Sequence, residues 1–307
     1  MILLKKVDDL SRWLEKQRLA GRSIGFVPTM GALHKGHISL IDISKKNAKI
    51  TVCSIFVNPT QFNDPKDFQK YPITIEKDIL LLEKAGTDVL FLPEVSEIYP
   101  GGVKELEKYD LGRLESLLEG AFRPGHFQGV CQVMRRLLEA VRPDHLFMGQ
   151  KDYQQCMVIR RLLEIIELPA ILHPCPIVRE EDGLAMSSRN MRLSEQQRNK
   201  AVAIYQALVQ LKKRWEIGIW DEAPGDLAAK VEELTWEAIS FLEAHDFRVD
   251  YVSIANPVTL EPIAGPITLE PIVAQHTREQ PTLNQPPAVA LIAAFLGEIR
   301  LIDNMPL

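Results

Sequence analysis

Two histidines that stand three residues apart close the segment PTMGALHKGH, residues 28–37. The apolar run at 24–27 before it predicts a buried strand, and the amphipathic run at 38–43 after it predicts a helix. A helix N-terminus presents unpaired N–H groups and partial positive charge, so it binds anions, phosphate above all. We therefore expect a nucleoside triphosphate at this turn, with His34 and His37 at the reacting phosphorus. The alternative is a pair of surface histidines beside a turn.

An asparagine and a glutamine follow the second predicted strand. The run at 50–57 is nearly all apolar and β-branched, as a parallel strand buried on both faces should be, and Asn58 and Gln61 come next. Ligands of open parallel sheets bind beyond the carboxyl ends of the strands. The two side chains are therefore candidate site residues, and a proline-containing turn with exposed amides is the alternative.

A lysine, an aspartate and a glutamine open the helix that follows the strand predicted at 145–148. Lys151 offers an ammonium group to phosphate. Gln155 stands three residues after Asp152, so both can face the same side of the first helical turn. The alternative is an aspartate that caps the helix, with solvated neighbours.

A loop at 186–190 carries Ser187, Ser188 and Arg189. Small hydroxyls and a permanently charged guanidinium suit the binding of a polyphosphate, although Ser-Ser-Arg is a common loop sequence. Each of these clusters is a weak signal by itself. Because all of them stand at strand ends or in loops and offer phosphate-binding groups, together they favour a nucleotide site.

Apolar strands alternate with helical segments through the first half of the chain. Repeats of this kind predict an α/β fold with a doubly wound parallel sheet. The composition then changes at a charged turn, and a long helix is predicted from the capping-box pair Ser194 and Gln197 to about Glu216. We predict a nucleotide-binding domain at 1–177 and a smaller α+β domain at 178–307.

A short sequence is duplicated near the C-terminus. The pentapeptide TLEPI occurs at 259–263 and again at 268–272, and a stretch rich in Pro, Gln and Thr follows at 275–287. The pattern predicts an extended loop over 259–287, with no chemistry visible in it.

Charge and cysteine content exclude several classes of function. The 307 residues carry a formal net charge of −5, which gives no general electrostatic reason to bind nucleic acid. Four cysteines stand singly, without a Cys-x-x-Cys pair, which indicates reduced, buried thiols rather than disulfides or a zinc site. No apolar run approaches the roughly 20 residues of a transmembrane helix. We expect a cytoplasmic protein that has neither a membrane nor a nucleic acid as partner.

Collected in order, these segments resemble the pantoate–β-alanine ligases (pantothenate synthetases) of the HxGH nucleotidylyltransferase superfamily. The resemblance covers essentially the whole chain, and its motifs in this order and spacing are highly specific. They are PTMGALHKGH at 28–37, SIFVNPTQF at 54–62, RPGHF at 123–127, KDYQQ at 151–155, DGLAMSSRN at 182–190 and RLIDN at 300–304.

The resemblance implies a Rossmann-like domain followed by a smaller C-terminal domain that acts as a lid, in a cytoplasmic homodimer. It also implies the ATP-dependent condensation of (R)-pantoate with β-alanine to pantothenate, through a pantoyl-adenylate, with release of pyrophosphate and AMP. Pantoate, β-alanine and ATP are then the small-molecule partners, and Mg²⁺ accompanies ATP.

The family's site residues are carried over to the positions of this sequence that match its motifs. The resemblance places ATP on Met30, Gly31, Ala32, Leu33, His34, Lys35, Gly36, His37, Gly149, Gln150, Lys151, Asp152, Val178, Met186, Ser187, Ser188 and Arg189. It implies proton donation by His37, contact of Gln61 with pantoate and β-alanine, and contact of Gln155 with pantoate. Asp78 is the position that best matches a residue near the magnesium ion. Gln150 stands where the family is expected to have a glutamate.

The hypothesis for the chemistry is charge stabilisation. When the pantoate carboxylate attacks the α-phosphorus, negative charge accumulates on the phosphate oxygens, so preorganised positive groups are needed. We expect His34, His37, Lys151 and Arg189, together with magnesium, to supply that charge. A protonated His37 would also neutralise the departing oxygen.

Two alternatives remain open. A related nucleotidylyltransferase would keep the nucleotide on its product, whereas a ligase releases free AMP. An inactive nucleotide-binding regulator would be expected to have lost some of the chemical residues, and all of them are present here. A fused kinase is disfavoured, since no Gly-x4-Gly-Lys-Ser/Thr phosphate loop occurs.

Overall fold

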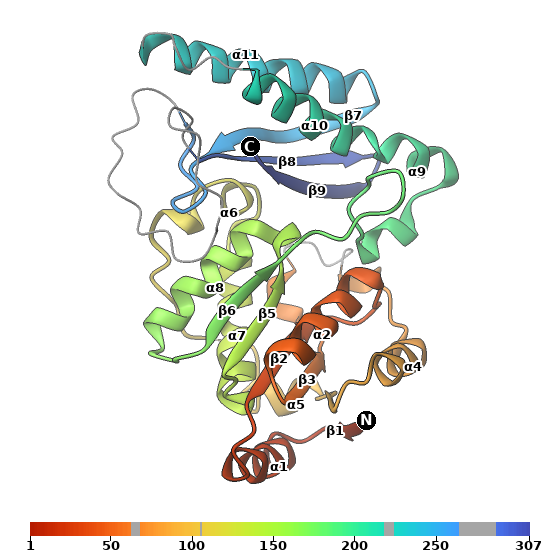
Figure 1. The fold of residues 1–307 in the computed structure, drawn as a ribbon, viewed down its shortest axis with the longest axis vertical. Coiled ribbons are helices and arrows are strands. Elements are labelled where there is room, and N and C mark those ends of the chain that lie inside the picture. Colours follow the sequence, from red (N-terminus) through yellow and green to blue (C-terminus); the bar gives the residue numbers. More distant parts are fainter. Residues whose placement is uncertain (63–67, 105, 218–223, 264–286) are drawn as a thin grey trace. The chain divides into compact units, whose positions relative to one another are not determined.

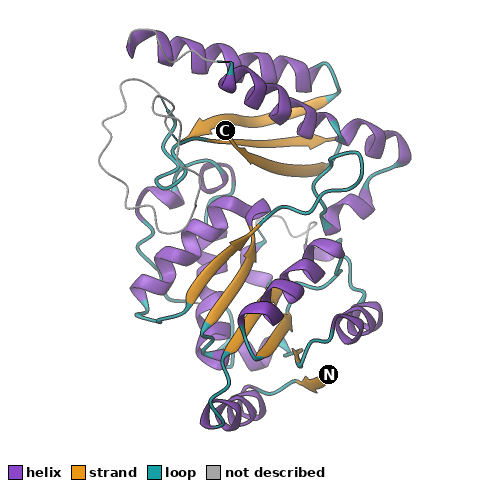
Figure 2. Cartoon of the chain, viewed as in Figure 1, coloured by secondary structure: helices purple, strands orange, loops and turns teal. Residues whose placement is uncertain are grey.

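The computed structural model describes residues 1–62, 68–104, 106–217, 224–263 and 287–307 (Figure 1). The chain divides into two compact units. The first comprises Met1–Arg179 and Met186–Met191, and the second comprises Glu180–Ala185 and Arg192–Leu307. Helices and strands occur in both units (Figure 2).

A six-stranded parallel sheet forms the centre of the first unit. Its strands are β1 (Ile2–Leu4), β2 (Ile24–Thr29), β3 (Ile50–Ile55), β4 (Val89–Phe91), β5 (His145–Gly149) and β6 (Ile171–Cys175). They lie in the order β1-β4-β3-β2-β5-β6. From β2 the chain proceeds toward one edge through β3 and β4, and from β5 toward the other edge through β6. The winding therefore reverses between β2 and β5, which is where open parallel sheets bind ligands.

Two groups of helices pack on this sheet. One group consists of α2 (Lys35–Asn47), which contacts β2, β3 and β5, and α4 (Ile75–Ala85), which contacts α2. In the other group, α7 (His126–Val141) contacts α1 (Val7–Leu19) and α8 (Tyr153–Ile165). The shorter helices are α5 (Val95–Ile98) and α6 (Glu119–Phe122), with 3-10 turns η1 (Pro59–Gln61), η2 (Gly112–Glu115), η3 (Gln150–Asp152) and η4 (Ser188–Arg192). Because helices cover the sheet, β3 is buried throughout, as its apolar sequence predicts.

The second unit packs helices on an antiparallel sheet. Its strands are β7 (Phe247–Ala255), β8 (Val289–Leu296) and β9 (Ile299–Pro306), and its helices are α9 (Glu195–Ala201), α10 (Ala203–Glu216) and α11 (Pro224–Glu243). Helix α11 contacts β7, and α10 contacts β8 and β9. Buried side chains such as Trp215, Leu242 and Ile292 share one cluster, so this unit has a hydrophobic core of its own.

The predicted fold class, a doubly wound parallel sheet with a smaller α+β domain, is confirmed. Two local predictions are wrong. The apolar residues at 176–178 predict a continuation of the strand before them, but β6 ends at Cys175. The long helix predicted after Ser194 is divided by a turn at Val202, although its capping box is present as predicted. Most of the loop predicted at 259–287 lies outside the described residues.

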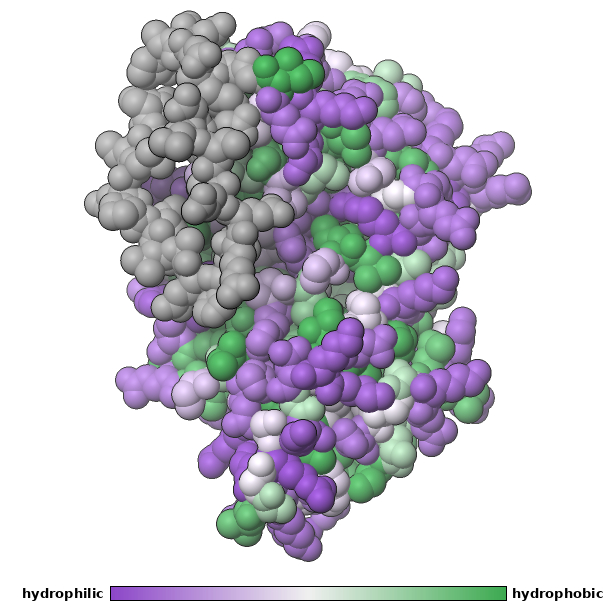
Figure 3. Space-filling model, viewed as in Figure 1, coloured by the Kyte–Doolittle hydropathy of each residue, from purple (hydrophilic) through white to green (hydrophobic). Residues whose placement is uncertain are grey.

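No helix in the described part of the chain is both long and apolar enough to cross a membrane. Figure 3 shows a face whose side chains are mainly hydrophilic, with hydrophobic residues scattered among them. Single exposed apolar side chains such as Leu19 are normal on a globular protein.

Gly25 allows α2 to approach β2 closely, since a Cβ there would overlap the Ser44 hydroxyl oxygen and lie 3.0 Å from the Ala48 Cβ. Because the site is packed, we expect Gly25→Ala to lower the free energy of unfolding by about 1–3 kcal/mol, measured by urea titration. Gly101→Ala is the matched control, because a Cβ at Gly101 meets nothing within 4 Å. Its change should stay within about 0.5 kcal/mol. Equal effects of the two substitutions would contradict the close approach.

Candidate active site

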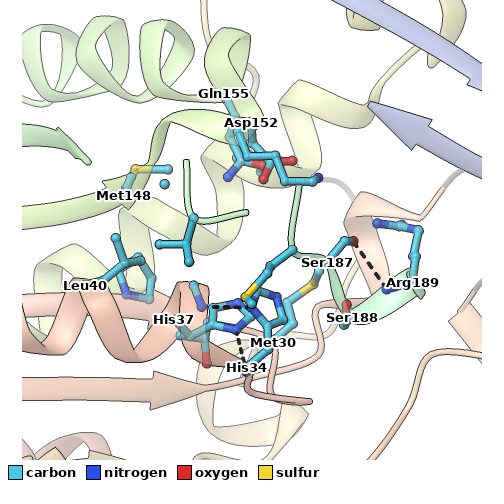
Figure 4. A pocket seen from close by; sticks show the side chains of 18 of the residues that line it. Met30, His34, His37, Leu40, Met148, Asp152, Gln155, Ser187, Ser188 and Arg189 are labelled. Atoms are coloured by element: carbon cyan, nitrogen blue, oxygen red, sulfur yellow. Dashed lines mark hydrogen bonds between the residues drawn. The ribbon is translucent and has the colours of Figure 1, made fainter. Parts of the chain in front are cut away.

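A pocket lies at the carboxyl ends of β2 and β5, where the winding of the sheet reverses. The residues that line it all belong to the first unit. Figure 4 shows His34 and His37 on one side of the pocket, Asp152 and Gln155 across from them, and Ser187 to Arg189 beside both. Segments that are far apart in the sequence thus converge on one cavity.

A carboxylate from α4 holds the turn that precedes α2. Asp78 is fully buried, and its two oxygens accept the backbone N–H groups of Ala32 at 2.9 Å and of Leu33 at 2.8 Å. The Thr74 hydroxyl donates to the same carboxylate at 3.0 Å. These three hydrogen bonds replace the hydration that the buried carboxylate has lost.

These contacts give Asp78 a structural role beside the one that the resemblance implies. The resemblance places it near a magnesium ion, but both of its oxygens are engaged by the protein and its side chain has no exposed surface. Within the described ranges, no cluster of three or more His, Cys, Asp or Glu side chains has an arrangement that would hold a metal ion. Asp78 therefore positions the turn, and its place near a magnesium ion stays a prediction.

The turn has left-handed backbone geometry at two consecutive residues. Gly31 has φ +81° and Ala32 has φ +51°, the second of which is uncommon for a residue with a side chain. A Cβ on Gly31 would lie 3.1 Å from Asp78 Oδ2, so a glycine there lets the carboxylate approach. Hydrogen bonding of the turn to Asp78 offsets the strain at Ala32.

Both histidines cap the N-terminus of α2. His34 is the N-cap residue, and its Nδ1 accepts the N–H of Gly36 at 3.2 Å. Nδ1 of His37 accepts the N–H of His34 at 3.3 Å. Because each Nδ1 is an acceptor, each neutral ring carries its hydrogen on Nε2 and offers that hydrogen to a ligand. A Cβ on Gly36 would come within 2.9 Å of the His34 ring, so a larger residue would displace the imidazole.

Burial determines the charge of the two imidazoles. Loss of hydration, and then the charge of Lys151, lowers the pKa of His34 to about 4. Loss of hydration, followed by the effects of His34 and Lys151, lowers the pKa of His37 to about 3. These pKa values disfavour the charged form of both rings in the absence of a ligand. Without a ligand both rings are neutral at pH 7, and the lysine and arginine side chains that line the pocket are Lys151 and Arg189.

The carboxyl end of β5 brings a lysine and an aspartate to the pocket. Lys151 and Asp152 lie in η3, directly after the strand, and Gln155 follows in the first turn of α8. All three line the pocket. A strand end and a helix start therefore supply a cation, a carboxylate and an amide within a few residues.

The loop that carries the serines and the arginine is fastened at several points. The N–H of Met186 donates to the Val178 carbonyl at 3.0 Å. The N–H of Arg189 donates to Ser187 Oγ at 3.3 Å, and Ser188 Oγ lies 3.3 Å from the hydroxyl oxygen of Tyr71. These bonds hold the hydroxyls and the guanidinium-bearing residue at the wall of the pocket.

Gln61, at the end of η1, has a fixed amide orientation. Its Oε1 accepts from Asn58 Nδ2 at 3.2 Å, and its Nε2 donates to Met30 Sδ at 2.9 Å. Asn58 is itself buried, donates to the Gly129 carbonyl at 3.1 Å and accepts from the Tyr99 hydroxyl at 2.8 Å. Because Asn58 donates to Gln61 Oε1, the Gln61 amide nitrogen lies on the other side of the group, where it donates to Met30, and the Gln61 side chain lines the cavity.

Most of the predicted site residues line this one pocket. They are Met30, His34, Gly36, His37, Gln61, Gly149, Lys151, Asp152, Gln155, Val178, Met186, Ser187, Ser188 and Arg189. The lining does not include Gly31, Ala32, Leu33, Lys35, Asp78 or Gln150. The amides of Ala32 and Leu33 face Asp78, and Lys35 is exposed on α2.

Sequence reasoning missed an apolar wall of the pocket. Its side chains come from α2, α7, β5 and the residue that follows β3, and they are Leu40, Phe56, Val130, Val133, Met134, Leu137 and Met148. Four of them follow one another at helical spacing on α7. That spacing is the ordinary pattern of a helix facing a core, and it does not distinguish a core from a pocket wall.

One family model matches nearly the whole chain. The model is described as Pantoate-beta-alanine ligase and matches residues 2–306. The pantothenate synthetase of Cytophaga hutchinsonii is 41% identical over 306 residues, which is 99% of each chain. That of Aquifex aeolicus is 40% identical over 305 residues, covering 99% of this chain and 98% of its own.

Solved structures are similar over the same length. The crystal structure of pantothenate synthetase from Thermus thermophilus has a TM-score of 0.82 and 37% identity, and the match covers 99% of both chains. Pantoate-beta-alanine ligase from Francisella tularensis, crystallised in complex with beta-gamma ATP and beta-alanine, has a TM-score of 0.75 and 32% identity. That match covers 100% of this chain and 97% of the other.

Replacement of Asp78 tests its role as an anchor of the turn. In Asp78→Asn an NH₂ group meets one of the two backbone N–H donors, so we expect the free energy of unfolding to fall by about 1.5–3 kcal/mol. The loss should be the same in EDTA as in excess Mg²⁺, as measured by urea titration. Asp42→Asn, on the exposed side of α2, is the control and should change little. A loss that appears only with Mg²⁺ would restore the metal role.

The protonation of the two histidines can be observed by nitrogen-15 NMR. At pH 7 we expect both rings as Nε2–H tautomers, with no titration near the ordinary pKa of 6.5, because burial lowers both pKa values. The unfolded chain takes up these protons at higher pH than the folded protein does. The free energy of unfolding should therefore fall as the pH drops from about 6.5 toward 4. Hydrogen on Nδ1, or titration near pH 6.5, would contradict the capping geometry.

Proposed function

The chain belongs to the pantoate–β-alanine ligase family, and we propose that the pocket of its first unit is the active site. The enzyme catalyses the ATP-dependent condensation of pantoate with β-alanine through a pantoyl-adenylate, and it releases pyrophosphate and AMP. One observation carries the assignment of the site. Two Nε2–H donors at a helix N-terminus share a single cavity with Lys151 and Arg189, at the reversal point of the sheet.

We assign the polyphosphate to the side of the pocket where the donors gather. His34 and His37 lie at the start of α2, where the helix dipole favours an anion. Lys151 provides a point charge, and Arg189 provides a planar guanidinium suited to phosphate oxygens. Ser187 and its neighbour Ser188 add hydroxyls. Support for this assignment comes from the number of phosphate-binding groups that line one cavity.

We assign pantoate to the side of the pocket with the two glutamines and the apolar wall. Gln61 and Gln155 both line the cavity and offer it two side-chain amides. Pantoate carries two methyl groups beside its hydroxyls, so it needs both polar and apolar contacts. Val130 and Met134 of α7 offer the apolar surface. The β-alanine carboxylate is assigned to the Gln61 amide.

In the first step a carboxylate oxygen of pantoate attacks the α-phosphorus of ATP and forms the acyl-phosphate bond. The bond from the α-phosphorus to the bridging oxygen breaks, and pyrophosphate leaves with the electron pair. Neutral Nε2–H groups of His34 and His37 donate to the phosphate oxygens as their charge grows. The charge of bound phosphates raises the pKa of His37, which brings it toward the proton-donor role that the family resemblance implies.

In the second step the amine of β-alanine attacks the acyl carbonyl of pantoyl-adenylate. The amide bond forms, the bond to the phosphate oxygen breaks, AMP leaves, and the nitrogen loses a proton. A mixed anhydride hydrolyses readily, so the site must keep water away from it. The apolar wall of α7 contributes to that exclusion, and we propose that the second unit acts as a lid.

The metal ion, the oligomeric state and the location are three further proposals. We propose that Mg²⁺ arrives on the phosphates of ATP, as is common for nucleotide sites, because Asp78 is engaged by the turn. We also propose a homodimer, as the family resemblance implies. A cytoplasmic location is in keeping with the four free, buried cysteines.

Pantoate-dependent exchange of labelled pyrophosphate into ATP tests the first step. We expect exchange that requires pantoate but not β-alanine, and release of free AMP once β-alanine is added. His37→Ala should lower the exchange rate by two or more orders of magnitude, about the loss of one key electrostatic donor.

His245→Ala is the matched control, since this histidine follows α11 in the second unit and bonds the Phe241 carbonyl. Its exchange rate should equal that of the unaltered protein. Near-normal exchange in His37→Ala would remove the role of His37. Nucleotide retained on the product would favour the rival nucleotidylyltransferase, and absence of exchange by folded protein would favour the inactive regulator.

A further inference from the structure

The motif RPGHF at 123–127 has no part in the assignments above. Its histidine, His126, opens α7 and is buried, with 6% of its surface exposed. His126 Nδ1 lies 2.8 Å from the backbone carbonyl oxygen of Gln61. His126 Nε2 lies 3.1 Å from Arg123 Nη1. The motif therefore connects an arginine, through a histidine, to a residue that lines the pocket.

These two partners determine which nitrogen of His126 carries the hydrogen. A carbonyl oxygen only accepts, so Nδ1 is the donor, and a guanidinium only donates, so Nε2 is the acceptor. The tautomer is opposite to that of His34 and His37. Burial, and then the charge of Arg123, lowers the pKa of His126 to about 4, which agrees with a neutral ring. Arg123 is placed in turn by Glu119, whose Oε2 lies 3.6 Å from Nη1.

Helix α7 also holds the backbone at η1 directly. A Cβ on Gly129 would overlap the Thr60 carbonyl and lie 2.9 Å from the Cα of Gln61. Gly129 stands one helical turn after His126, so the same side of α7 touches the backbone of η1 at two points. The side chain of Gln61 is oriented separately, by Asn58.

We propose that His126, oriented by Arg123, is a positioning residue that sets where Gln61 presents its amide to the substrate. The inference rests on the proposed assignment of Gln61 to pantoate and β-alanine. Asn58 decides which way the amide faces, and His126 decides where the backbone that carries it lies. Recognition by hydrogen bonds tolerates displacements of only about 0.5 Å, so loss of the His126 donor weakens recognition without removing any group from the pocket.

Substitution of His126 by Asn and by Gln distinguishes the contributions of the two ring nitrogens. Asn at position 126 places its NH₂ near the position of Nδ1, whereas Gln places its polar atoms near Nε2. We expect His126→Gln to raise the KM for pantoate about tenfold, because the Gln61 carbonyl loses its hydrogen bond and the amide is displaced. His126→Asn should stay within about threefold of the unaltered enzyme. The Kd for ATP, measured by calorimetry without pantoate, should stay within about twofold in both variants.

A double-mutant cycle shows whether His126 acts through Gln61. If it does, the KM for pantoate of Gln61→Ala combined with His126→Gln equals that of Gln61→Ala alone. The nitrogen-15 spectrum of the unaltered enzyme should show Nδ1–H for His126. The melting temperature of each variant shows whether a loss of activity is caused by a loss of stability.

Several outcomes would overturn the inference. Additive effects in the cycle would mean that His126 does not act through Gln61. Equal effects on ATP and pantoate, or equal behaviour of Asn and Gln at position 126, would indicate a general structural role. If Gln61→Ala leaves the KM values for pantoate and β-alanine unchanged, the assignment of Gln61 fails and the positioning role fails with it. A normal His126→Gln beside an impaired Gln61→Ala would overturn the positioning role alone.

Discussion

The site depends on one buried carboxylate. Asp78 lies on α4, yet it fixes the turn between β2 and α2 by accepting the N–H groups of Ala32 and Leu33. The turn places Ala32 in a backbone region that is unfavourable for it, and the carboxylate makes the conformation stable. Since α2 begins right after the turn, Asp78 also determines where the helix dipole and both histidines point.

Neutral histidines suit a site that must alternate between ligands of different charge. Two protonated imidazoles with ring centroids 4.1 Å apart would repel one another, and each would lose its capping bond because Nδ1 could no longer accept. Neutral rings keep the helix capped and still direct Nε2–H groups outward. Fixed donors of this kind need no reorganisation when charge develops on a phosphate, so they stabilise the transition state more than they stabilise the ground state.

The features that the sequence predicts are those encoded locally. Strands β2 and β3 were predictable because a run buried on both faces is apolar throughout, and the turn was predictable from Gly31 and Gly36 beside two histidines. The anchoring role of Asp78 was not predictable, because nothing near it in the sequence indicates that its backbone partners lie 45 and 46 residues earlier. The protonation of His37 was not predictable either, since it follows from burial. The apolar wall on α7 has the same spacing as a core face and remained hidden for that reason.

Gln61 and Gln155 differ in how the fold supports them, and the region between β4 and β5 contacts the elements that carry both. Gln155 lies on α8, a helix anchored at the end of β5, whereas Gln61 lies on a single 3-10 turn. The adjacent Gln154 donates to the carbonyls of Leu114 and Leu117 and thereby ties α8 to the segment that leads into α7. That segment ends at His126, which bonds η1. This segment therefore connects α8, which carries Gln155, with η1, which carries Gln61, and its packing contributes to the spacing of the two amides.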